Sequence, residues 1–235
     1  MTVEARSGAL VLADGAVPDR AVLDRAWPGW AAGIGLVIAA DGGARNAGRL
    51  GVRLDRWVGD GDSIAPDDLA ALGAAGVDIR RSPADKDESD TELALLAAVE
   101  AGADAVTILG ALGGVRVDHA LSNVGLLEHP ALAGRAAWLF DEHAIRLSLL
   151  AAPDDAGRAV TRELVGRAGD LVSLIPLGAS AAGVTTEGLR YPLAGEPLVL
   201  GRTRGVSNVR TGSTARVTLE SGRLLVVETP ATVRP

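Results

Sequence analysis

Residues 36–44 read LVIAADGGA, and this stretch decides the fold class. An uninterrupted apolar run, Leu36–Ala40, passes directly into an acidic and glycine-rich turn. Apolar residues on both faces of a strand are typical of a parallel sheet that is covered by helices. The turn places a carboxylate at the carboxyl end of the strand, where open α/β sheets bind their ligands. We therefore expect an α/β domain with a site at this edge of its sheet.

The same pattern of short apolar runs recurs through the first 150 residues. Strands are predicted at Gly8–Leu12, Leu36–Ala40, Arg56–Val58, Ala105–Leu109 and Ala136–Phe140. Three segments between them, Pro66–Ala75, Thr91–Ala101 and Asp118–Leu127, have helical spacing. Strands that alternate with helices indicate βαβ units and a parallel sheet. Residues 1–150 are therefore predicted to form an α/β domain.

The pattern changes after residue 150. Residues 150–169 are polar and lack periodicity, which predicts a connecting segment. Short β-rich runs separated by Gly, Pro, Asn or Ser follow at Asp170–Pro176, Ala182–Leu189, Pro197–Gly201, Ala215–Leu219 and Arg223–Glu228. Residues 151–235 are therefore predicted to form a small antiparallel β-sandwich or barrel.

The composition limits the classes of function. The chain has 235 residues, a net charge of −7 and no cysteine. An acidic chain lacks the basic face that a general nucleic-acid binder needs. Without cysteine, disulfides, thiol catalysis and Cys-based metal sites are excluded. No signal-peptide pattern and no apolar run of membrane-spanning length is found, so we expect a cytoplasmic protein with no membrane partner.

Three acidic or glycine-rich clusters each follow a predicted strand directly. They are residues 41–44, DGGA, residues 59–63, GDGDS, and residues 110–114, GALGG. In the second cluster, Asp60 and Asp62 are two residues apart, so both carboxylates could reach one Mg²⁺, which prefers oxygen ligands. The competing interpretation is a polar turn in which Asp62 or Ser63 caps a helix that begins near Pro66. Because the carboxyl ends of parallel strands meet at one edge of a sheet, the convergence of three clusters favours the metal site.

Two further segments carry candidate residues. In residues 85–92, DKDESDTE, the spacing of Ser89 and Glu92 predicts a capping box. One cap does not explain the density of Asp, so Asp90 is a candidate for an additional metal or substrate contact. After residues 110–114, whose backbone N–H groups could approach phosphate oxygens, the planar guanidinium of Arg116 could clamp a phosphate.

The residues after Arg116 open a predicted helix. Asp118 is expected to be its N-cap, and for His119 an orienting or core-edge role is favoured over that of a catalytic base. The sequence contains no Gly-x-x-x-x-Gly-Lys-Ser/Thr motif, so it is not a P-loop NTPase.

The ordered set of motifs resembles the thiamine pyrophosphokinase family. The motifs are Asp41-Gly42-Gly43-Ala44, Gly59-Asp60-x-Asp62-Ser63, Lys86-Asp87-x-Ser89-Asp90-Thr91-Glu92 and Gly113-Gly114-x-Arg116-x-Asp118-His119. The resemblance continues through Gly188-Leu189-x-Tyr191-x-Leu193 and Gly205-Val206-Ser207-Asn208. The sequence departs from the family pattern at Gly61, Ser89, Val115 and Tyr191. Since none of these departures removes a charged group, we expect altered affinity and retained activity.

The resemblance implies a Mg²⁺-dependent transferase that moves pyrophosphate from ATP to the hydroxyl of thiamine. It implies an ATP- and Mg²⁺-binding catalytic domain over residues 1–150, a thiamine-binding β-sandwich over residues 151–235, and a homodimer with thiamine between one subunit's α/β domain and the other's sandwich. By this resemblance the catalytic residues are Asp60, Asp62, Asp90 and Asp118, and the first three hold Mg²⁺. The ATP site is lined by Asp41, Gly42, Gly43, Gly113, Gly114, Arg116 and His119. Thiamine contacts Asp90, Thr91, Tyr191, Ser207 and Asn208.

Three other functions stay open at this level. A pyrophosphokinase for another small alcohol, such as a hydroxymethyl pterin, is disfavoured by the motifs around Tyr191 and Ser207. A metal-dependent phosphohydrolase would use water in place of the alcohol, and a nucleotide-binding module would bind without catalysis. Carboxylates spread over three loops favour an enzyme over the binding module. Either Asp60 or Asp90 could accept the proton of the hydroxyl.

Overall fold

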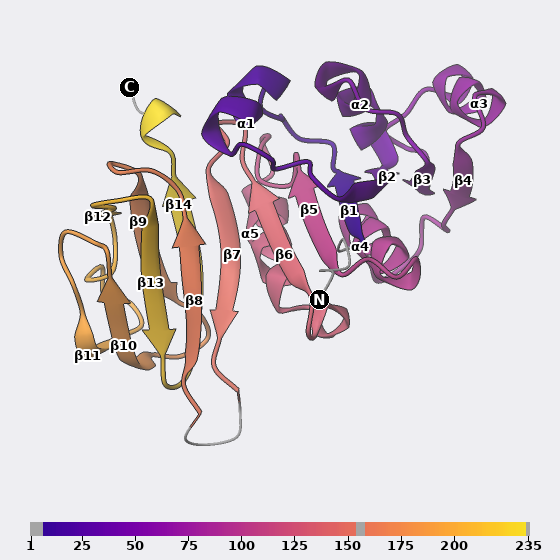
Figure 1. Cartoon of the computed structure of the whole chain (residues 1–235). Helices are drawn as coiled ribbons and strands as arrows, with labels where there is room; N and C mark the ends of the chain where they lie inside the picture. Colours follow the sequence, from indigo (N-terminus) through magenta and orange to yellow (C-terminus); the bar gives the residue numbers. More distant parts are fainter. Residues whose placement is uncertain (1–6, 154–157, 234–235) are drawn as a thin grey trace, which may run out of the picture. The chain divides into compact units, whose positions relative to one another are not determined.

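The computed structural model describes residues 7–153 and 158–233. The chain divides into two compact units, Met1–His143 and Ala144–Pro235 (Figure 1). The predicted boundary after residue 150 falls inside strand β7 (Arg146–Ala151), which belongs to the second unit. Within the described ranges no helix is both long enough and apolar enough to cross a membrane.

The first unit contains a parallel sheet in the strand order β6-β5-β1-β2-β3-β4. Its strands are β1 (Gly8–Leu12), β2 (Ile34–Ala40), β3 (Arg56–Gly59), β4 (Asp78–Arg81), β5 (Ala105–Leu109) and β6 (Ala136–Phe140). The predicted parallel α/β sheet is confirmed. Strand β4 was not predicted, because its sequence DIRR has no apolar run and it lies at the edge of the sheet, mostly exposed. The strand order reverses between β1 and β5, which makes the loops after these two strands a switch point.

Helices connect the strands of the first unit. They are α1 (Arg20–Ala26), α2 (Arg45–Leu50), α3 (Pro66–Ala74), α4 (Asp90–Glu100) and α5 (Val117–Gly125), with 3₁₀ turns η1 (Asp41–Ala44), η2 (Leu126–Glu128) and η3 (Pro130–Leu132). Helix α4 packs on β1, β2 and β3. The Ser89 half of the predicted capping box is confirmed, since Ser89 Oγ accepts a hydrogen bond of 3.2 Å from the backbone N–H of Glu92. The carboxylate of Glu92 lies 3.5 Å from His129 Nε2.

The start of α5 differs from the sequence-based expectation. The N-cap position is occupied by Arg116, whose side chain makes no capping hydrogen bond, and the helix begins at Val117. Asp118 lies one residue inside the helix, so the prediction that it is the N-cap is wrong. Its carboxylate is instead in the first turn, where the helix dipole favours an acidic group.

The second unit contains two antiparallel sheets, in the orders β12-β9-β14-β7 and β11-β10-β13-β8. Its other strands are β8 (Val160–Val165), β9 (Leu171–Pro176), β10 (Ala181–Glu187), β11 (Ala194–Leu198), β12 (Asn208–Val209), β13 (Thr214–Leu219) and β14 (Arg223–Thr229), and η4 (Ala231–Val233) follows them. Figure 1 shows the sheet with β8 and β13 as one layer over the sheet with β9 and β14. Apolar residues from both sheets form one core, which includes Leu164, Val172, Leu174, Val184, Val217 and Val226. The predicted small β domain is confirmed as a sandwich.

Two details of the second unit correct the prediction. Strand β8 lies inside residues 150–169, which were predicted to be a connecting segment. The inward-facing positions of β8 are Val160, Arg162 and Leu164. Because Arg162 is polar, the strand lacks the alternation of apolar and polar residues that would identify it in the sequence. Strand β11 ends at Leu198, although a strand was predicted at Pro197–Gly201. It pairs with β10 at the edge of its sheet, where Pro197 is tolerated.

Candidate active site

Asp41 is the first residue after β2, and its backbone is held in an unusual conformation. Its φ is 43°, in the left-handed region that non-glycine residues rarely adopt. The indole Nε1 of Trp57 donates a hydrogen bond of 2.9 Å to the Asp41 carbonyl. The backbone N–H of Ser63 donates one of 2.9 Å to Asp41 Oδ2. At Gly59 a Cβ atom would lie 2.9 Å from Asp41 Cβ, so glycine is needed for this close approach.

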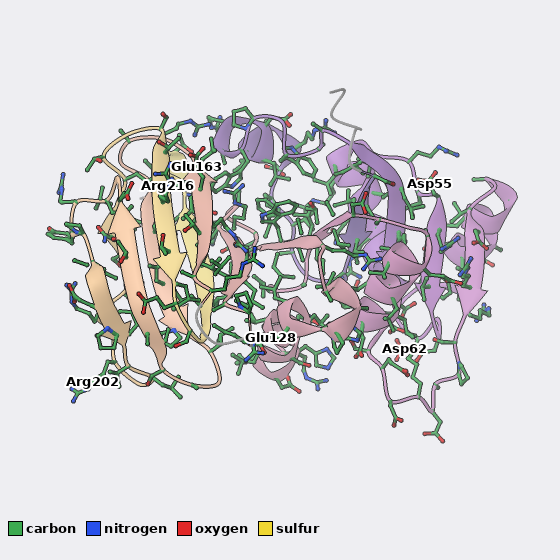
Figure 2. All side chains as sticks on the ribbon, turned by 60° about the horizontal axis from the view of Figure 1, so that its bottom comes forward. Asp55, Asp62, Glu128, Glu163, Arg202 and Arg216 are labelled. Atoms are coloured by element: carbon green, nitrogen blue, oxygen red, sulfur yellow. The ribbon has the colours of Figure 1, made fainter. Side chains whose placement is uncertain are left out.

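Three carboxylates converge at the carboxyl edge of the sheet. Oxygen atoms of Asp41, Asp60 and Asp62 all lie within 4.8 Å of one another. Asp62, marked in Figure 2, belongs to the loop that follows β3. This loop is ordered by its own polar groups, because Asp60 Oδ1 accepts a 3.1 Å hydrogen bond from the Asp62 N–H and Asp62 Oδ1 accepts one of 2.8 Å from Ser63 Oγ.

The alternative interpretation of this loop is wrong in one respect, because neither Asp62 nor Ser63 caps the next helix. Helix α3 does begin at Pro66, but its N-cap position is Ala65 and no side chain caps it. Proline at the first helical position has no N–H that needs an acceptor. Asp62 and Ser63 therefore do not act as helix caps. Asp62 is one of the three converging carboxylates, and Ser63 Oγ donates a hydrogen bond to it.

The electrostatics of the three carboxylates suit a bound cation. Asp41 is only 3% exposed, and its Oδ1 is buried with no hydrogen-bond donor among the described residues. Burial, aided by the charges of Asp62 and Asp90, raises the pKa of Asp41 from its ordinary 3.8 to about 6. The hydrogen bond from Ser63 lowers the pKa of Asp62. A buried acid with an unused oxygen beside two other carboxylates fits a divalent cation with oxygen preference, such as Mg²⁺.

Asp90 joins this group through a lysine. The Nζ atom of Lys86 lies 2.7 Å from Asp90 Oδ1, 2.9 Å from Ser82 Oγ and 3.4 Å from Asp60 Oδ2. The Lys86 side chain is 12% exposed. The sequence grouped Asp60, Asp62 and Asp90; the structure groups Asp41 with the first two and links Asp90 to Asp60 through Lys86.

The predicted glycines of the nucleotide site have a packing role. A Cβ atom at Gly42 would lie 2.2 Å from Asp14 Oδ1, and one at Gly43 would lie 2.0 Å from the Leu12 carbonyl. At Gly113 a Cβ would lie 3.0 Å from the backbone N of Ala16. These glycines let the loops after β2 and β5 pack against the loop after β1. Gly114 differs, since its φ is 103° and a Cβ there would meet nothing within 4 Å.

The loop after β1 was not recognised from the sequence. The side-chain amide of Asn46 donates hydrogen bonds of 2.8 Å to the Ala13 carbonyl and 3.0 Å to the Gly15 carbonyl. The Gly15 N–H bonds to the Gly110 carbonyl at 2.9 Å, which joins the loops after β1 and β5 at the switch point. A buried asparagine in a short helix carries no distinctive sequence signal, so only the fold identifies its role.

Arg116 and Asp118 form a pair of their own on the surface. The guanidinium donates two hydrogen bonds to the carboxylate, of 2.9 and 2.5 Å, and both side chains are more than 60% exposed. This contact holds the pKa of Asp118 well below its ordinary value. His119 follows on the same helix and is exposed. A phosphate that binds Arg116 must therefore share the guanidinium with Asp118.

In the second unit the structure brings together the residues that the sequence assigned to thiamine. Asn208 Oδ1 accepts a 3.0 Å hydrogen bond from the Tyr191 N–H, and Asn208 Nδ2 donates one of 2.7 Å to the Tyr191 carbonyl. Tyr191 is 57% exposed. Ser207 has a φ of 60°, and its N–H bonds to Ser173 Oγ at 3.0 Å. Asn208 thus fixes the backbone that presents the tyrosine ring.

A buried ion pair lies directly after this segment. Arg210 and Glu228 are each about 1% exposed, and Arg210 Nη2 donates to Glu228 Oε1 at 2.5 Å. Arg210 Nη1 also donates to the Leu164 carbonyl at 2.5 Å, and Arg146 Nε donates to Glu228 Oε2 at 2.9 Å. The pair therefore ties β14 to β8 and to the end of the segment that carries Asn208.

The fold and site define a chain of two units, an α/β unit with an acidic group at the carboxyl edge of its parallel sheet and a separate β-sandwich. Residues 31–138 match the family model described as the catalytic domain of thiamin pyrophosphokinase. Residues 160–224 match the model described as its vitamin B1 binding domain. Together the two matches cover most of the chain. The chain belongs to the thiamin pyrophosphokinase family and is a transferase.

Individual relatives agree with this assignment. Thiamine pyrophosphokinase of Bacillus subtilis is 27% identical over 169 residues, 72% of this chain and 75% of that protein. Thiamine pyrophosphokinase 1 of rice is 28% identical over 74% of this chain, an alignment that spans 65% of the rice protein. The crystal structure of the Bacillus subtilis enzyme superposes with a TM-score of 0.79 over 95% of this chain and 99% of the other, at 24% identity, and so has the same fold.

Proposed function

We propose that this chain transfers a pyrophosphoryl group from ATP to the hydroxyl of thiamine in a Mg²⁺-dependent reaction that gives thiamine diphosphate and AMP. The observation that carries the proposal is the group formed by Asp41, Asp60 and Asp62 at the carboxyl edge of the sheet. Family membership supports this reaction, and the three carboxylates offer a place for the cation that polyphosphate chemistry requires.

The three carboxylates would hold the cation. Asp41 offers the buried Oδ1 that has no donor among the described residues, and Asp60 and Asp62 each offer an oxygen within 4.8 Å of it. When bound, Mg²⁺ offsets phosphate charge and fixes the in-line geometry. The protein contributes the rigidity of the group, because Trp57 and Ser63 hold Asp41 in place before substrate arrives.

Asp90 is the better candidate for the group that accepts the hydroxyl proton of thiamine. Asp60 is a member of the carboxylate group and its oxygens are needed for the cation, whereas Asp90 lies outside that group. Asp90 is the first residue of α4, so the helix dipole favours its charge, and Thr91 beside it would contact the same substrate. The ammonium of Lys86, 2.7 Å from Asp90 Oδ1, orients this carboxylate.

We assign the nucleotide contacts to the first unit and the aromatic contact with thiamine to the second. We place the phosphates over the loops after β1, β2 and β5, where the strand order reverses. In the second unit the exposed ring of Tyr191, with Ser207 and Asn208, would contact thiamine. An aromatic face suits this ligand because thiamine is a cation.

A homodimer is part of the proposal. Val115, Val117 and Leu121 are 97%, 67% and 69% exposed, so α5 and the residues before it present apolar side chains to solvent. Exposed apolar groups that cluster on one element are typical of association surfaces. Sedimentation equilibrium would give twice the chain mass if the proposal is right, and the mass of one chain would contradict it.

The reaction is tested by following products. The purified protein is incubated with ATP, Mg²⁺ and thiamine, and AMP and thiamine diphosphate are quantified while thiamine and metal are omitted in turn. Equal amounts of both products, formed only in the complete mixture, are the expected result. AMP without thiamine diphosphate would indicate water or another alcohol as the acceptor. Nucleotide binding without any product would indicate a binding module.

A further inference from the structure

Lys86 is the only lysine in the sequence, and it lies among carboxylates. All other basic side chains apart from the histidines are arginines. A chain that otherwise uses arginine throughout has a lysine at the one position where a compact ammonium bridges Asp60 and Asp90. A planar guanidinium spreads its donors over a fork, whereas an ammonium directs three hydrogens from one atom.

The three acceptors of this ammonium are not equivalent. Asp90 Oδ1 at 2.7 Å and Ser82 Oγ at 2.9 Å are at full hydrogen-bond distance. Asp60 Oδ2 at 3.4 Å is at the outer limit. An ammonium has three hydrogens, so its donors are all assigned, and the weakest of the three contacts is the one to the carboxylate group.

That weak contact is the one that competes with a cation. Asp60 belongs both to the ammonium's acceptors and to the three carboxylates within 4.8 Å of one another. A divalent cation held by Asp60 would weaken this contact, whereas the contacts of Lys86 with Asp90 Oδ1 and Ser82 Oγ would remain and the third hydrogen would be free. This hydrogen of the Lys86 ammonium would then lie beside Asp41, Asp60 and Asp62, where a polyphosphate oxygen could accept it.

We propose that Lys86 is a phosphate-binding residue of the nucleotide site, which exchanges its contact with Asp60 for a phosphate oxygen when nucleotide and cation bind. This inference rests on the proposed function. Lys86 would give the acidic site a positive charge that can pair with the anionic phosphates of the nucleotide. The sequence contains no phosphate-binding motif that includes this lysine.

The first test compares binding of the cation with binding of the nucleotide. Lys86→Gln, Lys86→Arg and the wild type are titrated with Mn²⁺ alone, followed by electron paramagnetic resonance, and then with α,β-methylene-ATP and Mg²⁺ by calorimetry. Arg80→Gln is the matched control, since it removes a positive charge from β4 that pairs with Asp78 and Glu100 instead.

We expect Lys86→Gln to weaken nucleotide binding by about 10- to 100-fold and to leave Mn²⁺ binding unchanged or tighter. Lys86→Arg should recover part of the nucleotide affinity, and Arg80→Gln should bind both ligands as the wild type does. Equal weakening for nucleotide and Mn²⁺ would show that Lys86 only arranges the carboxylates, and unchanged nucleotide binding would also overturn the inference. A wild type that binds no nucleotide would instead overturn the proposed function.

A second measurement covers the case in which Lys86→Gln does not fold. Protein grown with ¹³Cε-labelled lysine gives one side-chain signal, because the chain has one lysine. Addition of α,β-methylene-ATP to the Mg²⁺-saturated protein should shift this signal beyond the effect of Mg²⁺ alone, and AMP, which lacks the β- and γ-phosphates, should not. A signal that the triphosphate leaves in place would refute phosphate contact at Lys86.

Discussion

The indole of Trp57 donates its only hydrogen bond, of 2.9 Å, to the backbone carbonyl of Asp41, the residue whose buried carboxylate begins the acidic group. Trp57 is fully buried on β3, and Asp41 follows β2, the neighbouring strand. The contact therefore joins two strand ends and holds Asp41 at its positive φ. A core side chain thus decides where a site carboxylate lies.

Trp57→Phe should loosen this arrangement. The substitution removes the donor and leaves a small cavity, so we expect the free energy of unfolding to fall by about 1–3 kcal/mol and Mn²⁺ affinity to fall about tenfold. Trp27→Phe is the control, because Trp27 is buried in the same unit against Phe140. It should lose stability and keep its metal affinity. Equal losses of metal affinity in the two variants would contradict the role given to the hydrogen bond.

Asp60→Asn and Asp62→Asn should each lower the turnover number by about 10²–10⁴-fold, since each removes one charge from the three carboxylates that we propose to hold the cation. Steady-state formation of thiamine diphosphate at saturating substrates measures the effect. Asp67→Asn, in the first turn of α3, removes a carboxylate outside this group and should keep wild-type turnover. Near-normal rates in both site variants would sink the metal assignment.

The raised pKa of Asp41 predicts a pH-dependent gain in stability for Asp41→Asn. The folded state binds the proton up to about pH 6 while the unfolded chain releases it near 3.8, so in the wild type stability falls as pH rises through this interval. Without metal, Asn should therefore stabilise the protein by about 2–3 kcal/mol at pH 7.5 and by little at pH 3.5. Urea unfolding at the two pH values in EDTA checks this. A gain of equal size at both would show that ionisation is not the cause.

Within the sandwich, Glu228→Gln should be strongly destabilising. It leaves the fully buried Arg210 without its counter-charge, and breaking such a pair costs about 3–5 kcal/mol. Arg216→Gln breaks surface ion pairs of β13 with Glu163, visible in Figure 2, and with Glu187, and should cost at most about 1 kcal/mol. Thermal unfolding of the two variants makes the comparison, and similar losses would contradict it.

Asn208→Ala should raise the KM for thiamine by about tenfold with a smaller effect on the turnover number, because the lost hydrogen bonds position Tyr191 and do not touch the reacting phosphates. Tyr191→Phe keeps the ring and should be close to the wild type, whereas Tyr191→Ala should match or exceed the loss in Asn208→Ala. A fall in turnover at unchanged KM would place Asn208 in the chemical step instead.

The parts of the fold that the sequence predicts are those with local apolar signals. Strands β1, β5 and β6 have their predicted bounds, because each is a short, mostly apolar run with a glycine or an aspartate within two residues of its end. Strand β4 is exposed and charged, and β8 includes an inward-facing arginine, so neither produces the apolar pattern that the prediction needs.

The site residues also divide into those that the sequence predicts and those that only the fold brings together. Asp60 and Asp62 are neighbours in the chain, so the sequence predicts that they act together. The inclusion of Asp41 depends on the pairing of β2 with β3, and the bridge from Lys86 to Asp60 spans 26 residues. Contacts of this kind are tertiary, and no local pattern encodes them.

The burial of Lys86 has a practical consequence for proteolysis. A lysine-specific endoprotease has one bond to cleave in this sequence, between Lys86 and Asp87. The protease must accept the side chain, yet its ammonium is hydrogen-bonded and the side chain is 12% exposed, so cleavage requires the segment to open. The rate at which a single cut divides the chain at residue 86 therefore measures how often the acidic loop comes apart, with no label and no catalytic assay.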